Sequence, residues 1–157
     1  MIHDIPLFPS PNFDARPAGT HIDTIVLHAT VLNTLDEVIG HFADPASKVS
    51  AHYTIDRDGT TASHVSPDQR AWHAGQSSMK DGRRQVNDFS IGIELVNLND
   101  GNDPYPSSQI QALRDLLKAL AAIYPIQYVV THAECADPPG RKSDPAGFDL
   151  NWISDLP

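Results

Sequence analysis

Short apolar segments alternate with two helical patterns along this chain of 157 residues, in the order β-α-β-β-β-α-β. Apolar runs at residues 22–28, 89–96 and 127–131 predict three buried strands. Strands and helices in this order pack as layers around one core. We therefore expect residues 1–157 to form a single α/β domain, in which α-helices flank a central mixed β-sheet.

Local signals predict the first helix and a hairpin. Thr34-Leu-Asp-Glu37 has the pattern of a capping box and predicts a short helix that ends near Ala43. Asp58-Gly59 lies between two predicted strands, residues 51–57 and 60–65, and is the strongest short hairpin signal in the chain. These elements would fill the chain between the first two buried runs.

The second helix is predicted to begin at Ser107 or Ser108, either of which could cap it, and to run to about Tyr124. Pro125 then ends the helical pattern. The apolar residues at helical spacing are expected to form its buried stripe: Ile110, Leu113, Leu117, Leu120 and Tyr124.

Two segments lack a regular pattern. Residues 1–20 hold four of the thirteen prolines and predict an irregular arm laid over the domain. Residues 66–88 are polar and predict a long loop. A loop of this length inside a compact domain is more often functional than idle, so it is a candidate for part of a site.

The charge of the chain argues against a nucleic-acid partner. Its net charge is −9 and its pI is about 5.1, and its 11 Lys and Arg residues are scattered rather than gathered in a basic stripe. We expect a small or neutral substrate instead. No apolar run approaches the length of a membrane span, so no transmembrane segment is expected.

The cell compartment stays open at this stage. Residues 1–6 show no basic region followed by an apolar stretch, so no secretory signal is visible. The single cysteine, Cys135, excludes an internal disulfide and fits a reducing compartment. We expect a cytoplasmic protein, or a periplasmic one if the natural chain carries a leader that this sequence lacks.

Two of the eight histidines follow predicted strands, and this placement points to a metal site. His28 ends the run Ile25-Val-Leu-His28, and His132 follows residues 128–131. A single histidine at a strand end is more often a structural residue, but two such strands favour a shared site, since adjacent strands lie about 4.8 Å apart. Asp144 follows on a stiff loop rich in proline and glycine. Two histidines and one aspartate are donors that a catalytic zinc ion uses, with a fourth position left for water.

Other polar residues leave alternatives open. Cys135 competes with Asp144 as the third ligand, because a thiolate binds zinc well, but it lies only three residues from His132 and could instead be a packing residue. Glu94 lies inside an apolar strand, where it could form a buried ion pair or act as a general base whose pKa is raised by burial. Lys142 could face the charge that develops on a substrate oxygen.

The long loop begins with Trp72-His-Ala-Gly75, which could form a substrate wall, although packing of the tryptophan against the sheet explains it about as well. We take Trp72, His73 and Arg141 as candidate substrate-binding residues. His52 is expected to pack within the hairpin. The other four histidines are assigned to the surface without a role: His3, His21, His41 and His64.

These segments together resemble the zinc-dependent N-acetylmuramoyl-L-alanine amidases, a superfamily that also contains the peptidoglycan recognition proteins. The resemblance extends from Ser10 to Asp149, and any one segment would be weak evidence for it. Five segments in the right order make it specific: Ile25-Val-Leu-His-Ala-Thr30, Val49-Ser-Ala-His-Tyr-Thr-Ile-Asp-Arg-Asp-Gly59, Ala71-Trp-His-Ala-Gly75, Asn87-Asp-Phe-Ser-Ile-Gly-Ile-Glu94 and Gly140-Arg-Lys-Ser-Asp-Pro145.

The resemblance implies an amidase-like fold and a reaction. The reaction is hydrolysis of the amide between L-alanine and N-acetylmuramic acid, in its ordinary or 1,6-anhydro form, with peptidoglycan or a muropeptide as the partner. The resemblance also implies that His28, His132 and Asp144 bind Zn²⁺, that Glu94 is the catalytic acid and base, and that Lys142 stabilises the oxyanion.

The branch of the superfamily also follows from the resemblance. Phage members and recognition proteins carry a tyrosine at the position of Ala51, so Tyr53 does not inherit that catalytic role. Their third ligand is a cysteine at the position of Asp144, and the aspartate here is typical of the recycling and periplasmic branches. Two other functions stay open: a peptidoglycan-binding module without catalysis, and a lytic effector that acts on whole cell wall.

Overall fold

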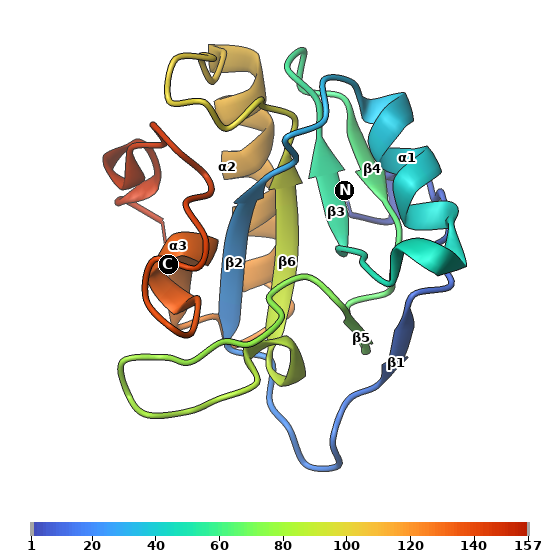
Figure 1. Cartoon of the computed structure of the whole chain (residues 1–157), viewed down its shortest axis with the longest axis vertical. Coiled ribbons are helices and arrows are strands. Elements are labelled where there is room, and N and C mark those ends of the chain that lie inside the picture. The colour runs from blue at the N-terminus through green and yellow to red at the C-terminus, as the bar shows by residue number, and fades with distance from the viewer. Residues whose placement is uncertain (1, 157) are drawn as a thin grey trace.

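The centre of the fold is a five-stranded β-sheet with the strand order β4-β3-β6-β2-β7, in a computed structural model that describes residues 2–156 (Figure 1). Parallel pairing joins β2 to β6 and to β7, and β3 to β6, whereas β4 runs antiparallel to β3. The expected mixed sheet is thus confirmed. Its strands are β2 (Thr24–Ala29), β3 (Tyr53–Ile55), β4 (Thr61–Ser63), β6 (Ser90–Leu95) and β7 (Tyr128–Thr131).

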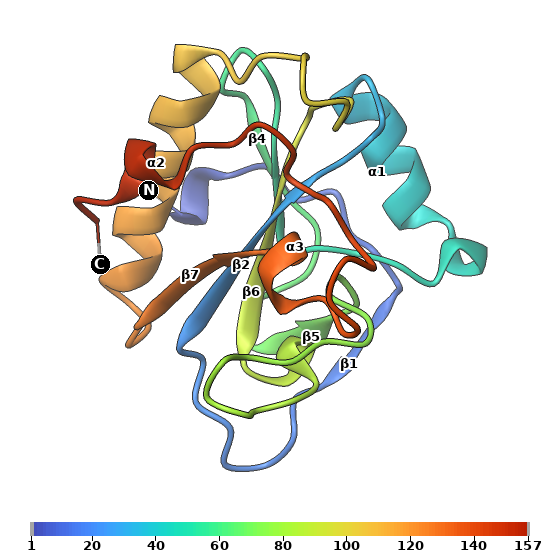
Figure 2. The ribbon, with the colours of Figure 1, turned by 60° about the vertical axis from the view of Figure 1, so that its left-hand side comes forward.

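The two faces of the sheet have different neighbours. Strand side chains alternate between faces, and Leu27 and Ile93 point to the face that α2 (Ser107–Ala121) covers with its leucines. His28 and Glu94 therefore point to the other face. That face carries α1 (Leu35–Ala43) and α3 (His132–Cys135), on the side of the sheet away from α2 (Figure 2). The site is built between these two helices.

The first helix begins as the sequence predicts. The Thr34 hydroxyl accepts a hydrogen bond from the Glu37 N–H, and the Glu37 carboxylate accepts one from the Thr34 N–H. This capping box satisfies backbone donors that the first turn of a helix leaves free. The helix ends at Ala43, also as predicted.

The second helix differs from the prediction at both ends. Its N-cap is Pro106, and Ser108 does not cap it, because the Ser108 hydroxyl instead donates to the Arg57 carbonyl in the hairpin turn. The helix ends at Ala121, before Tyr124. The predicted stripe is otherwise right: Leu113, Leu117 and Leu120 are buried, and Ile110 and Tyr124 pack partly buried against the same cluster.

The hairpin has the predicted turn but shorter strands. The Asp56 N–H donates to the Thr60 carbonyl, and the Gly59 N–H donates to the Asp56 carbonyl. Gly59 has φ +92°, which only glycine adopts without strain, so three residues form the connection. Arg57 belongs to this turn rather than to the strand.

The expectation that residues 1–20 and 66–88 are irregular is wrong in part. Strand β1 (Phe13–Ala15) pairs antiparallel with β5 (Gln69–Ala71), which joins the arm to the long loop. Strands of three residues are too short to show a sequence period. The remaining short elements are 3₁₀ helices: η1 (Ile2–Asp4), η2 (Pro45–Ser47), η3 (Val86–Asp88) and η4 (Leu150–Ile153).

The ends of the predicted domain, Met1 and Pro157, lie outside the described residues. Within residues 2–156, none of the helices has the length and apolar character that crossing a membrane requires. The parallel strands β2, β6 and β7 end at the same edge of the sheet.

Candidate active site

The carboxyl ends of three neighbouring parallel strands bring the candidate ligands together. His28 lies near the end of β2 and is the register partner of Glu94 in β6. On the other side of β2, β7 ends at Thr131, and His132 begins α3 directly after it. Open α/β sheets bind ligands at this edge. The expected neighbourhood of the two strand-end histidines is confirmed.

Three donor atoms converge here. The His28 Nδ1 lies 3.0 Å from the His132 Nδ1, and the Asp144 Oδ2 lies 3.1 Å from the His132 Nδ1 and 3.3 Å from the His28 Nδ1. All three residues are buried, and in the described part of the chain they form a group that could hold a metal ion. Ligand atoms of a tetrahedral zinc ion, with bonds of about 2.0–2.2 Å, lie about 3.3 Å apart. The spacing therefore suits one small cation.

The hydrogen bond on the far side of the His132 imidazole selects the tautomer that a metal ligand needs. The His132 Nε2 lies 3.1 Å from the Ala74 carbonyl, which can only accept, so the hydrogen is on Nε2 and the Nδ1 lone pair is free. The His28 Nε2 lies 3.0 Å from the His73 Nδ1, and the His73 Nε2 lies 3.1 Å from the Ser90 hydroxyl. With the hydrogen of His28 likewise on Nε2, three lone pairs face one another, and a cation between them removes that repulsion.

The charge states also match those of metal ligands. Burial lowers the pKa of His28 to about 4, although contact with Asp144 opposes the shift. Burial alone would raise the pKa of Asp144, but contacts with His132 and His28 hold it well below its usual range. The site at neutral pH is thus a neutral imidazole beside a carboxylate, the forms that bind metal.

Cys135 does not belong to this cluster. Burial raises the pKa of its thiol to about 11, so the thiol is protonated at neutral pH. Its Sγ lies 3.7 Å from the His132 carbonyl and packs among Val26, Ala74 and other apolar side chains. The geometry favours Asp144 as the third donor and packing as the role of Cys135.

Glu94 lies beside the donor cluster without a partner. Its Oε2 is buried and has no hydrogen bond to any described residue, and no ion pair to it is found within residues 2–156. Burial raises the pKa of Glu94 to about 8, the charge of Asp144 adds to the shift, and Lys142 opposes it. Buried polar atoms are nearly always satisfied in proteins, so an unpaired carboxylate here indicates a role in chemistry rather than in stability.

Residues 18–147 match the N-acetylmuramoyl-L-alanine amidase family. The matched region contains all of the residues that form the cluster. The chain belongs to this family. The resemblance and the enzyme class predicted from the sequence motifs are thus confirmed.

Two curated relatives of this amidase align with it over different shares of their own length. It is 37% identical to the 1,6-anhydro-N-acetylmuramyl-L-alanine amidase AmpD of Citrobacter freundii, over 92% of this chain and 84% of AmpD. It is 35% identical to the N-acetylmuramoyl-L-alanine amidase AmiD of Escherichia coli, over 83% of this chain but 51% of AmiD. The amidase therefore corresponds to most of AmpD and to about half of AmiD.

Solved structures show the same fold. A crystal structure of a selenomethionine AmpD derivative matches with a TM-score of 0.85 and 34% identity, covering 98% of this chain and 94% of that chain. The complex of AmiD from E. coli with anhydro-N-acetylmuramic acid-L-Ala-D-γ-Glu-L-Lys matches with a TM-score of 0.76 and 30% identity, covering 89% of this chain and 60% of that chain.

A cavity of about 200 Å³ opens beside the cluster of the amidase. Lys142, Trp72 and His73 line it, as expected for residues near a substrate, and their contact with substrate stays a prediction. Helix α1 adds Val38, His41 and Phe42 to its wall. The assignment of His41 to a surface without a role overlooked this position, which a helix directly after the β2 ligand could have suggested.

Arg141 is not among the described residues that line this cavity, and its contact with substrate stays a prediction. Its guanidinium donates to the carbonyls of Ala74 and Gln76 at 2.9 and 2.6 Å. The Ala74 carbonyl is the same group that faces the His132 Nε2. Arg141 therefore braces the group that orients His132.

His73 lies underneath the cluster as well as beside the cavity. Its ring packs on Gly92 of β6, where an added Cβ would lie 2.5 Å from the His73 Cγ. Gly92 therefore leaves the space in which His73 reaches the His28 Nε2. A glycine inside a strand often marks such a close approach, and this signal was open to sequence reasoning.

Two more histidines are buried, and only His64 was expected at the surface. His64 is buried rather than at the surface, with its Nδ1 3.1 Å from the Phe8 carbonyl and its Nε2 2.9 Å from the Thr54 hydroxyl. His52 is buried as expected, but it lies just before β3 and accepts a hydrogen bond from the Gly92 N–H. The arm covers the His64 side chain, which explains why local sequence did not reveal its burial.

Proposed function

We propose that this amidase is a zinc enzyme that cleaves the amide between the lactyl group of N-acetylmuramic acid and L-alanine in soluble 1,6-anhydromuramyl peptides. The observation that carries the proposal is the convergence of three metal donors at 3.0–3.3 Å beside the unpaired Glu94 carboxylate. The choice of the anhydro substrate rests on the coverage of AmpD, whose name states that specificity.

The proposed metal ligands are His28, His132 and Asp144. A zinc ion held by them would lower the pKa of a water molecule to about 7 and polarise the substrate carbonyl. The Ala74 carbonyl keeps His132 in the required tautomer, and the His73 Nδ1 can accept the hydrogen of the His28 Nε2 and so orient that ring. Because their donor atoms already converge, the residues are preorganised for the cation.

Glu94 is proposed to move the proton. As a carboxylate it takes a proton from the attacking water, and as the acid it delivers that proton to the nitrogen of the leaving L-alanine. Its free Oε2 has no competing partner among the described residues, and it lies across from His28 in the neighbouring strand. A single group can thus serve both halves of the reaction.

Lys142 is proposed to stabilise the oxyanion. It lies two residues before Asp144 and lines the same cavity, so its ammonium can face a negative oxygen near the metal site. A fixed positive charge is most useful where charge develops in the transition state.

The Lys142→Ala variant is expected to keep its zinc and lose about 100- to 1,000-fold in turnover, because it removes one oxyanion partner and no metal donor. Metal analysis and initial rates on the same sample test this. Lys80→Ala is the control, since Lys80 is exposed and does not line the cavity. Wild-type turnover in Lys142→Ala would show that Lys142 does not act on the oxyanion.

The Cys135→Ser variant is expected to bind zinc with wild-type stoichiometry and to keep most of its activity. The buried thiol points to the His132 carbonyl rather than to the donor cluster. Metal content by mass spectrometry and a rate assay are sufficient. An empty site in this variant would instead make Cys135 a ligand.

Product analysis decides the substrate. Purified sacculi and anhydromuramyl tripeptide are each incubated with the protein, with and without a chelator, and the products are identified by mass spectrometry. We expect free peptide from the soluble substrate and loss of that product with chelator. Preferential release from sacculi would indicate a lytic effector, and binding without product would indicate a non-catalytic module; either would overturn the proposal.

A further inference from the structure

One side chain from another part of the chain, that of Asn99, hydrogen-bonds to the loop that carries Lys142 and Asp144. The Ala146 N–H donates to the Asn99 Oδ1 at 2.7 Å, and the Asn99 Nδ2 donates to the Ser143 hydroxyl at 3.1 Å. These two contacts flank Asp144 on both sides. A single amide group therefore bridges the segment in which the proposed metal donor lies.

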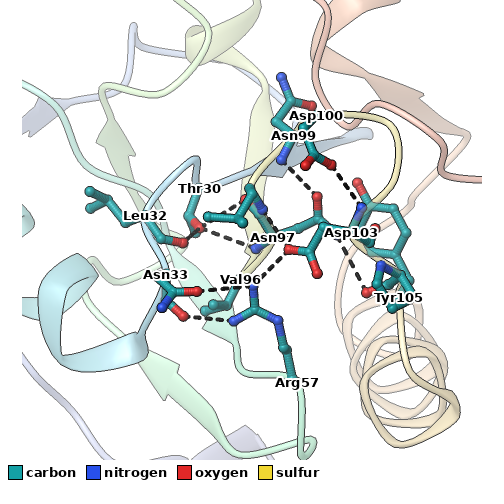
Figure 3. Close-up of polar contacts among 12 residues, drawn as sticks. Thr30, Leu32, Asn33, Arg57, Val96, Asn97, Asn99, Asp100, Asp103 and Tyr105 are labelled. Atoms are coloured by element: carbon teal, nitrogen blue, oxygen red, sulfur yellow. Dashed lines mark hydrogen bonds and ion pairs between the residues drawn. The ribbon is translucent and has the colours of Figure 1, made fainter.

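Asn99 itself is held in an unusual backbone conformation. It has φ +58°, in the left-handed region that asparagine adopts more readily than most residues. Its N–H donates to the Asn97 Oδ1 at 2.8 Å, and the buried Asn97 donates from its Nδ2 to the Asp103 carbonyl at 2.9 Å (Figure 3). Local geometry thus aims the Asn99 side chain in a defined direction.

The loop after β6 is in turn braced by other elements. The Asp103 carboxylate accepts a hydrogen bond from the Leu98 N–H at 2.8 Å and pairs with Arg57 at 2.7 Å. Arg57 also donates to the Asn33 carbonyl at 2.6 Å, so the hairpin turn and the segment before α1 meet at this loop (Figure 3). The loop that carries Asn99 is therefore held in place by a connected network of hydrogen bonds and an ion pair.

Further contacts reinforce the same junction. The Tyr105 hydroxyl donates to the Ala146 carbonyl at 3.0 Å, and a Cβ on Gly147 would lie 3.5 Å from the Gly101 carbonyl oxygen. From the other side, the Ala133 N–H in α3 donates to the Asp144 carbonyl at 2.9 Å. The loop after β6 and α3 thus hold the ligand segment from two directions.

We propose that Asn99 is a positioning residue for the hydrolysis, which holds residues 143–146 so that Asp144 completes the metal site and Lys142 faces the cavity. The inference rests on the proposed function. Groups that orient a metal ligand from outside the site typically contribute about 10- to 100-fold to metal affinity or activity. The same range is expected for Asn99.

The test uses Asn99→Gly, because glycine accepts the positive φ while the bridging amide is lost with the rest of the side chain. We expect zinc affinity and kcat each to fall about 10- to 100-fold with a smaller change in KM. Hydrogen exchange of the Ala146 amide should speed up in the zinc-free protein. Asn99→Asp should recover much of the loss, because aspartate tolerates the same backbone conformation and keeps the acceptor for the Ala146 N–H.

The matched control is Asn102→Gly, since among residues 2–156 the Asn102 side chain hydrogen-bonds to the Asp100 carbonyl in the same loop and to no residue of the 143–146 segment. Wild-type zinc affinity and Ala146 exchange in Asn99→Gly would overturn the inference. So would a lower melting temperature with unchanged zinc affinity, which would make Asn99 merely structural. Absence of zinc from the wild type and from the control would refute the proposed function. The hydrogen exchange of the Ala146 amide needs no zinc, so it would still show whether Asn99 holds residues 143–146.

Discussion

Glu94→Gln is expected to lower kcat by about 100- to 10,000-fold while the protein keeps its fold, its zinc and its affinity for substrate. Glutamine has nearly the size of glutamate but cannot accept the proton from water. The Glu94 Oε2 has no hydrogen-bond partner among the described residues, so the substitution breaks no contact at that atom. The loss should therefore appear in the chemical step alone.

The proposed role of Glu94 also predicts the direction in which activity changes with pH. Burial, followed by the charge of Asp144, raises the pKa of Glu94 to about 8, and Lys142 opposes the shift. The base acts only when ionised, so activity falls as pH drops through this pKa. A bound cation favours the carboxylate and moves this acid limb to lower pH. Glu94→Gln should lack the limb.

Zinc content, substrate binding and rate must be measured on one preparation of Glu94→Gln. Asp115→Asn is the control, because it neutralises an exposed carboxylate that contacts Gln111 on α2, the helix that covers the opposite face of the sheet. A zinc-loaded Glu94→Gln with the wild-type rate would place the base elsewhere, and His73 would be the next residue to test.

Removal of a metal donor is expected to have the largest effect of all. His28→Ala and Asp144→Ala should reduce zinc from about one per chain to a trace at equal metal concentration, and activity should fall below detection. Each substitution leaves two protein donors where a catalytic zinc site uses three. Asp144→Ala also removes the negative charge that lies against both imidazoles.

Asp144→Cys provides an informative comparison, because a thiolate is an accepted zinc donor. We expect it to keep zinc and to show altered activity, since the softer thiolate donor changes the chemical properties of the bound metal. Circular dichroism should show that chelated wild type stays folded, because the α2 face of the sheet is an apolar core independent of the site. Full zinc occupancy in both alanine variants would show that neither His28 nor Asp144 is a metal ligand.

Local signals were sufficient for much of the fold. The α1 capping box is predictable because Thr34 and Glu37 lie within one helical turn. The start of α2 was not, because the Ser108 hydroxyl is taken by the Arg57 carbonyl, a contact across 51 positions in the chain. Tertiary contacts override local capping preference where they offer the same hydroxyl a better partner.

The sequence by itself determined the order of the five strands of the central sheet and of α1 and α2, the family, and the candidates His28, His132 and Asp144. It could do so because apolar periodicity is local, and because each histidine lies at the end of an apolar run. Their chemistry is also readable from residue type alone.

Only the tertiary structure decided which residues surround that cluster. It paired β1 with β5, placed Arg141 on loop carbonyls instead of in the cavity, and set His73 against His28 across 45 positions. It also joined Asn99 to Ser143 across 44 positions. Such contacts depend on how distant segments pack, and no local pattern in one chain specifies which distant partner a polar side chain will meet.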